Sequence, residues 1–137
     1  MDLRAKIDRI YFKLSVESKD IFSLMLARNG ALNRLGSEDE EGSTAFFMGR
    51  TDEPLFDQLL ASLSDDMLEL TGRYEYPDLR GERCVLTITL EGQDLETGFE
   101  FTYGSEAVGP PEEIVDWVDR AITLTDPWYE AQLVRRR

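Results

Sequence analysis

The chain has 137 residues, a hydrophobic content of 42% and a formal net charge of −13 at pH 7. This length and apolar content are typical of one folded domain with its own core, and they exclude a chain that is disordered over most of its length. The acidic excess excludes nucleic acid and anionic membranes as partners, because like charges repel, and it favours a basic protein partner.

Charge is distributed unevenly along the sequence. Residues 1–36 have a net charge of +3, residues 37–134 have −19, and the arginines at 135–137 add +3. The basic residues of the first segment are too dispersed for a nucleic-acid patch, so we expect them to pair with acidic groups of the same chain or across a homodimer. These residues include Arg4, Lys6, Arg9, Lys13 and Lys19.

The sequence contains no histidine and a single cysteine, Cys84. Catalytic triads, Cys–His pairs, zinc sites built from histidine or thiolates, and an internal disulfide are therefore excluded. No catalytic residue, cofactor or metal site is predicted. Cys84 shares one face of an alternating strand with Leu86, which predicts a small core residue. A reactive thiol activated by the nearby Arg80 and Arg83 is the alternative.

The compartment is predicted from the thiol content and from the N-terminus. A single cysteine is typical of a reducing compartment. The first residues lack the apolar core of a signal peptide, and no apolar run approaches the roughly 18 residues that a membrane-spanning helix needs. We therefore expect a cytoplasmic protein.

The segment 10–48 is predicted to be rich in strands. Apolar residues alternate with polar ones from Ile10 onward, as they do in a strand that is buried on one face. The same alternation continues after a turn at Ser18-Lys19-Asp20 and again after Asn29-Gly30. Asn29-Gly30 predicts a two-residue type I′ turn, which needs positive φ at both positions. The patterns together predict an antiparallel meander over about 10–36.

An acidic loop follows the meander at 37–43. Three interpretations are open: a solvated loop, a calcium site, and a docking surface for a basic partner. An EF-hand places its acids at alternate positions, whereas here they are consecutive, so the calcium site is the poorest match. We adopt the docking surface as the hypothesis. Its carboxylates are Glu38, Asp39, Glu40 and Glu41.

Two amphipathic helices are predicted, one on each side of a second hairpin. A short strand over 44–48 precedes the first helix, 52–63, where acidic residues and Pro54 suit the first turn. The hairpin spans 82–103 and shows the same alternation as the meander. The second helix spans 111–123.

The C-terminal segment is predicted to form a short helix of its own over 126–134. Thr125-Asp126-Pro127 has the composition of an N-cap followed by a first helical turn. Trp128 and Tyr129 lie in this helix, and two interpretations are open for them. They either pack back on the domain or serve as anchors of a protein interface.

The sequence thus predicts an α+β fold in a single domain, 1–137: an antiparallel sheet built from two meander or hairpin groups, with two main amphipathic helices packed on one face. The predicted function is a non-catalytic acidic protein-binding domain, of inhibitory or immunity type, that neutralises a basic partner. One alternative is an adaptor or structural subunit that self-assembles through aromatic residues. The other is a carboxylate-based or small-ligand-binding enzyme.

Overall fold

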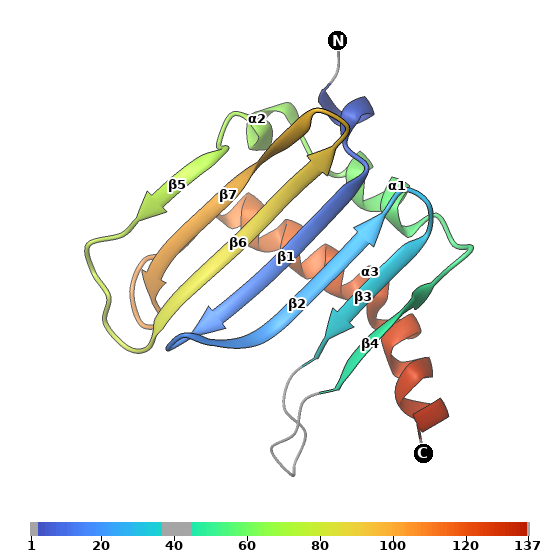
Figure 1. Ribbon diagram of the computed structural model, residues 1–137. Coiled ribbons are helices and arrows are strands. Elements are labelled where there is room, and N and C mark those ends of the chain that lie inside the picture. Colours follow the sequence, from blue (N-terminus) through green and yellow to red (C-terminus); the bar gives the residue numbers. More distant parts are fainter. Residues whose placement is uncertain (1–2, 37–44, 137) are drawn as a thin grey trace.

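The computed structural model describes residues 3–36 and 45–136. These residues form one sheet and a set of helices (Figure 1). In chain order the elements are η1 (Leu3–Lys6), β1 (Arg9–Val16), β2 (Lys19–Ala27), β3 (Ala31–Leu35), β4 (Phe46–Arg50), α1 (Leu55–Ala61), α2 (Asp65–Leu68), β5 (Gly72–Glu75), β6 (Arg83–Gly92), β7 (Leu95–Gly104) and α3 (Glu112–Arg136). The predicted α+β class is confirmed.

The seven strands lie in the order β4-β3-β2-β1-β6-β7-β5. The predicted meander supplies β1, β2 and β3, and the predicted hairpin supplies β6 and β7. The two groups join because β1 pairs antiparallel with β6, so that Phe12 lies opposite Ile88. At the far edge, β5 pairs parallel with β7. The helices cover one face of the sheet, and α3 crosses it diagonally (Figure 1).

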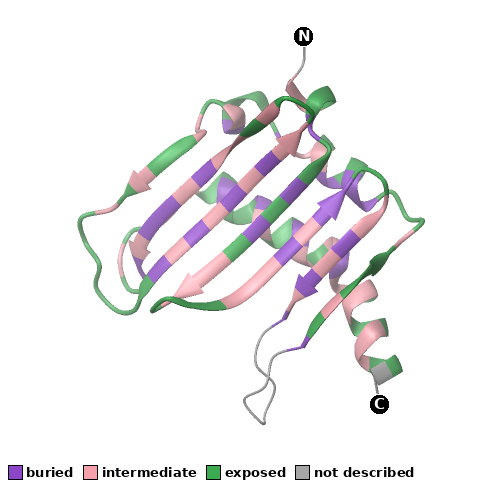
Figure 2. Cartoon of the chain, in the orientation of Figure 1, coloured by how far each residue is buried: buried purple, intermediate pink, exposed green. Residues whose placement is uncertain are grey.

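The core lies between the sheet and α3, and it follows from the alternation in the strands. Buried residues alternate with exposed or intermediate ones along the central strands (Figure 2), so every second side chain points at the helices. Phe12 and Trp117 meet in the middle of this layer with ring centroids 5.1 Å apart. The Trp117 Nε1 donates to the Leu59 carbonyl at 3.1 Å and to the Ser62 Oγ at 3.1 Å, which ties α3 to α1.

The predicted position of the type I′ turn was wrong. Two positive φ angles occur at Glu17 (50°) and Ser18 (66°), so the two-residue turn joins β1 to β2. At the predicted site only Gly30 has a positive φ, 94°, and the connection is three residues long. The Asn29 side chain explains the difference, because its Oδ1 accepts a hydrogen bond from the backbone N–H of Ala31.

The first predicted helix, 52–63, is shorter than expected and is followed by a second one. α1 begins after Pro54, and a separate turn of helix, α2, follows. Ser64 separates the two because its backbone is extended and its side chain accepts a hydrogen bond from the backbone N–H of Met67, as an N-cap does. The predicted strand 44–48 is observed as β4, shifted two residues toward the C-terminus.

The predicted break between the helices 111–123 and 126–134 was wrong, because α3 is continuous and contains Pro127. Proline in a helix interior removes one backbone hydrogen bond, but tertiary packing overrides this cost. Thr125 is buried and its hydroxyl donates to the Ala121 carbonyl at 2.9 Å, inside the helix, so it does not act as an N-cap. Trp128 packs against the core one residue beyond the proline.

Candidate functional site

One face of the sheet bears no helix in the described part of the chain (Figure 1). The strand pairings place residues of six strands in one row across this open face. The row is polar at β6 and apolar at β4, with an aromatic ring in the middle. From β7 to β4 it contains Gly98, Thr89, Tyr11, Met25, Asn33 and Met48.

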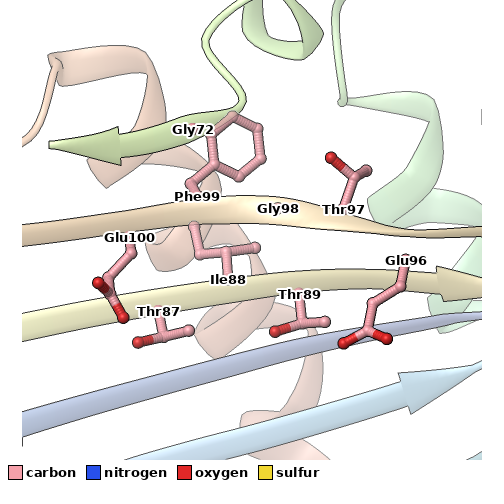
Figure 3. Close-up of a pocket in the computed structure, with 9 residues that line it drawn as sticks. All are labelled: Gly72, Thr87, Ile88, Thr89, Glu96, Thr97, Gly98, Phe99 and Glu100. Carbon is pink, nitrogen blue, oxygen red and sulfur yellow. The ribbon is translucent and has the colours of Figure 1, made fainter.

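A shallow depression of about 380 Å³ lies on the open face around Gly98, where β7 has no side chain (Figure 3). Its polar lining comes from three threonines, Thr87, Thr89 and Thr97, and two carboxylates, Glu96 and Glu100. Glu100 is neutralised by Arg73, whose Nε lies 2.8 Å from its carboxylate. A general acid or base needs a carboxyl group that is held away from water. This open hollow does not provide such an environment.

The opposite, helical face of the molecule is acidic along α3. Glu112, Glu113, Asp116 and Asp119 are exposed over the first turns of this helix. Asp116 follows Glu112 by four residues and Glu113 by three, and Asp119 follows Asp116 by three, so these side chains lie along one side of the helix. Within the described residues, no ion pair neutralises any of these four carboxylates. We call them the α3 acids.

Several basic residues of the N-terminal segment are held by acidic groups of the same chain, as one of the two predicted alternatives required. Arg4 lies 2.8 Å from Asp65, and Arg9 lies 3.2 Å from Glu91. Arg28 lies 3.5 Å from Asp8. These pairs consume cations that would otherwise offset the acidic surface. The excess of negative charge is therefore left on groups such as the α3 acids.

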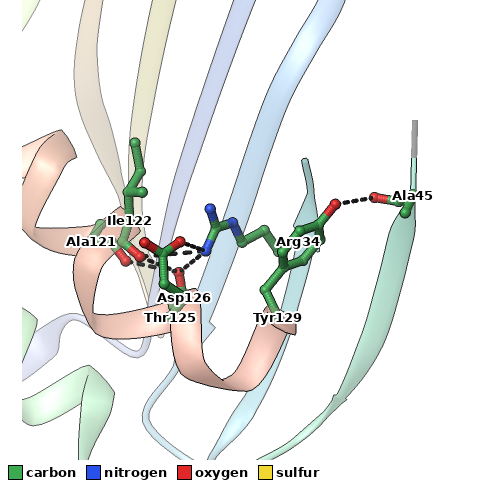
Figure 4. A network of polar contacts seen from close by, with 7 residues as sticks. All are labelled: Arg34, Ala45, Ala121, Ile122, Thr125, Asp126 and Tyr129. Carbon is green, nitrogen blue, oxygen red and sulfur yellow. Dashed lines mark hydrogen bonds and ion pairs between the residues drawn. The ribbon is translucent and has the colours of Figure 1, made fainter. Parts of the chain in front are cut away.

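The network in Figure 4 joins β3 to the second half of α3. Arg34 occupies an inward position of β3 and is only 7% exposed. Its Nη1 lies 2.6 Å from the Asp126 carboxylate and donates to the Thr125 hydroxyl at 3.1 Å. The guanidinium also lies 4.6 Å from the centre of the Tyr129 ring. The Asp126 carboxylate is partly exposed, but it is paired with Arg34, so the role of the network is to fix α3 on the sheet.

Sequence reasoning missed the buried role of Arg34. The signal was its place in the alternation of β3, where Leu32 and Arg34 share the inward face. A buried arginine requires an acidic partner, but that partner, Asp126, lies 92 residues further along the chain. Only the fold brings the two together.

Trp128 and Tyr129, two of the residues predicted to bind a partner, pack against the sheet of their own chain. Trp128 is half-buried over Gly49, where an added Cβ would lie 3.0 Å from the indole ring. Tyr129 makes an edge contact with Phe47 at 5.5 Å, and its hydroxyl donates to the Ala45 carbonyl at 3.4 Å. The other predicted residues, Glu38, Asp39, Glu40 and Glu41, lie outside the described residues.

Cys84 is buried among the inward side chains of β6, as predicted. Burial is the main cause that raises the pKa of its thiol above the usual value, and the carboxylates of Glu82 and Glu17 raise it further. A reactive cysteine needs a lowered pKa. The nearby Arg80 does not supply the required positive charge, because it pairs with Asp78 at 2.8 Å.

In the described part of the chain, acidic and thiol side chains nowhere gather in groups of three or more that could hold a metal ion. No helix of that part combines the length and the apolar character that crossing a membrane requires. Comparisons with protein families, with curated proteins and with solved structures found no match to this chain.

Proposed function

We propose that this chain is a non-catalytic acidic protein-binding domain that neutralises a basic protein partner, in the manner of an inhibitor or immunity protein. The observation that carries the proposal is the set of α3 acids, which are exposed and have no ion pair within the described residues. A basic protein supplies the complementary charge.

Solvation and helix stabilisation explain only part of this acidic surface. Glu112 and Glu113 stand in the first turn of α3, where carboxylates are stabilised by the positive end of the helix dipole. Asp116 and Asp119 lie beyond that turn. Four like charges on adjacent turns also repel one another, which is a cost to the isolated domain. A basic partner removes this repulsion on binding.

The packing of α3 on the sheet holds the α3 acids on a rigid surface. Ile114, Trp117 and Ala121 are buried on the side of the helix that faces the sheet. The acids on the other side are therefore presented without a rearrangement of the backbone. A preorganised charged surface speeds association and loses little conformational entropy on binding.

Three features support a non-catalytic role in the cytoplasm. The chain contains no histidine, so the side chain that most often transfers protons near neutral pH is missing. Its one thiol is buried with a raised pKa, and the depression on the open face is shallow. A single thiol without a disulfide partner suits a reducing compartment.

The proposal is tested by capture of partners from a lysate of the source organism at low salt, with elution by a salt gradient. We expect one stoichiometric basic protein that is released at moderate salt. The specific variant neutralises the α3 acids as Glu112→Gln, Glu113→Gln, Asp116→Asn and Asp119→Asn. Its matched control removes four other exposed acids as Glu82→Gln, Asp94→Asn, Glu96→Gln and Glu106→Gln.

Both variants change the net charge by the same amount, so only the position of the charge differs. Loss of capture in the specific variant alone supports the proposed surface. Equal capture by the wild-type chain and by both variants contradicts it. Equal loss in both variants would show an attraction to net charge without a defined surface, which also contradicts it.

A further inference from the structure

Within the described residues, the outer edge of β4 pairs with no other strand. β4 is the terminal strand of the sheet. The backbone N–H and C=O groups of its successive residues point alternately toward β3 and away from the sheet. The N–H of Gly36 donates to the Ala45 carbonyl and the N–H of Thr51 donates to the Gly30 carbonyl, which fixes the alternation. Phe47 and Gly49 therefore bond toward β3, and the backbone groups of the residues between and beside them point outward. We call these outward groups, from Phe46, Met48 and Arg50, the β4 edge.

The side chains of the β4 edge make it suitable for pairing with another strand. Met48 is 74% exposed and Phe46 is 50% exposed, both on the open face. The Arg50 guanidinium carries its charge at one end of the edge and donates to the Asn29 carbonyl of its own chain at 2.7 Å, whereas Met48 in the middle of the edge is uncharged. Natural sheets protect exposed edges with charged side chains. The opposite edge follows this rule, because β5 exposes Arg73 and Glu75.

We propose that the β4 edge pairs antiparallel with the β4 edge of a second copy of this chain, about a two-fold axis at Met48. In this register Met48 lies opposite Met48 of the second copy, and Phe46 lies opposite Arg50. Every residue with outward backbone groups then faces another such residue, so the described strand satisfies all of its free donors and acceptors. A register that sets Arg50 opposite Arg50 would place like charges together and leave most of these groups unpaired.

The projecting end of α3 is compatible with this pairing. α3 passes beneath β4, and its last turns extend beyond that strand (Figure 1). The two-fold axis is perpendicular to the sheet, so both helix ends lie on the same side of the joined sheet. Each end exposes the apolar Val134 together with an acid and a base, Glu130 and Arg135. Each helix end thus exposes one positive and one negative side chain, so the two ends can attract each other.

Salt is expected to affect dimerisation and the binding of the proposed basic partner in opposite directions. Each copy has a net charge of −13, so two copies repel each other at low salt. Added salt screens this repulsion, and hydrogen bonds and apolar contacts of the edge are screened much less. Dimerisation therefore strengthens with salt, whereas capture of a basic protein weakens. This difference separates the two interactions in one protein preparation.

The first test measures mass against concentration by analytical ultracentrifugation, at low and high salt. We expect the wild-type chain to form a dimer that is stronger at high salt. Met48→Lys places a charge at the centre of the edge and should weaken the dimer about tenfold or more. Val108→Lys is the matched control, because Val108 is 76% exposed in the loop between β7 and α3. A dimer that is equally weakened by both substitutions overturns the proposal.

The second test locates the axis without a destabilising charge. Paired residues in this register have Cα atoms about 5.5 Å apart, which a disulfide can span. Met48→Cys should therefore form a covalent dimer on mild oxidation, and Val108→Cys should not. Cys84 is buried and does not compete. Equal rates of cross-linking overturn the proposed register. If the wild-type chain is monomeric at all concentrations and salt levels, the proposal that a second copy pairs with the β4 edge is wrong. The remaining partner for this edge is then an extended strand of another protein.

Discussion

Arg34 on β3 and Asp126 on α3 form an ion pair of 2.6 Å that is buried at the arginine end and half-exposed at the carboxylate end. The guanidinium is further enclosed by the Tyr129 ring, and its Nε has no hydrogen-bond partner among the residues that the structure describes. The pair therefore fixes the second half of the helix on the sheet while it leaves one polar atom of the arginine unsatisfied.

The two partners of this pair are expected to respond differently to substitution. Asp126→Ala leaves a buried guanidinium without its counter-charge and should lower the free energy of unfolding by about 2–3 kcal/mol, which is below the range for fully buried pairs because Asp126 is partly exposed. Arg34→Met removes the charge and keeps the volume, so its loss should be smaller. Chemical denaturation of both variants shows which of them loses more free energy of unfolding. A larger loss for Arg34→Met contradicts this interpretation.

Pro127 is expected to reduce the stability of α3 in its present position. Pro127→Ala restores one backbone donor inside a helix that is already continuous, so the free energy of unfolding should rise by about 1–2 kcal/mol. Thermal unfolding with circular dichroism detects the change. Lower stability of this variant would mean that the proline sets a bend on which the packing of Trp128 and Tyr129 depends.

The dependence of stability on alkaline pH is expected to report on one buried group, the Cys84 thiol, and one half-buried group, the Tyr103 hydroxyl. Burial raises the pKa of the Cys84 thiol and of the Tyr103 hydroxyl above their usual values. Both groups therefore ionise first in the unfolded chain. Their contribution to stability is complete below about pH 8.5, the ordinary pKa of cysteine, and is lost as the pH rises toward their folded values. Urea titrations from neutral to alkaline pH should show this fall, and a flat profile would contradict it.

The same burial predicts that the native Cys84 thiol is unreactive. A thiol reagent should modify it at the rate at which the protein opens, and rapidly once denaturant unfolds the chain. A stopped-flow assay with a chromogenic disulfide measures both rates. Rapid modification of the folded protein would contradict the assignment of Cys84 to the core.

A separate prediction concerns the acidic loop at 37–43 and its effect on the association rate. Neutralising Glu38, Asp39, Glu40 and Glu41 together should slow association with the basic partner several-fold at low salt, because rim charges act mainly on the association rate. The unfolding transition should stay unchanged. An unaltered association rate would show that the loop is not part of the docking surface, and a lost unfolding transition would show that these residues support the fold.

Much of the fold could be predicted because it depends on local patterns. The alternation from Ile10 onward and again around Ile88 predicted the central strands, and the acid-rich turns with proline located α1 and α3 approximately. The pairing of β1 with β6 depends on contacts between residues far apart in the sequence. A sheet built from the two groups was predicted, but no local pattern contains the strand order, so the pairing of β1 with β6 that joins the groups was not predicted.

The errors have physical causes in particular residues. Thr125 has the composition of an N-cap, but its burial under β3 makes the helix continue. Asn29-Gly30 suits a type I′ turn, but the Asn29 side chain stabilises a longer connection, and Glu17 and Ser18 adopt the unfavourable positive φ instead. In both places a side chain makes a contact that cap and turn preferences of single residues do not take into account. For the candidate site, the excess of acids was evident from the composition, whereas the exposure of Asp116 and Asp119 required the orientation of α3.

The proposed binding of a basic partner is tested most directly by its association rate over a range of salt concentrations. The measurement compares the wild-type chain, the variant that lacks the α3 acids and the matched control variant with the partner captured from the lysate. We predict a wild-type rate that falls steeply with salt, a slow rate with a shallow salt dependence for the α3 variant, and a nearly wild-type rate for the control. A partner whose association rate is the same for all three proteins at low salt would contradict the proposed surface.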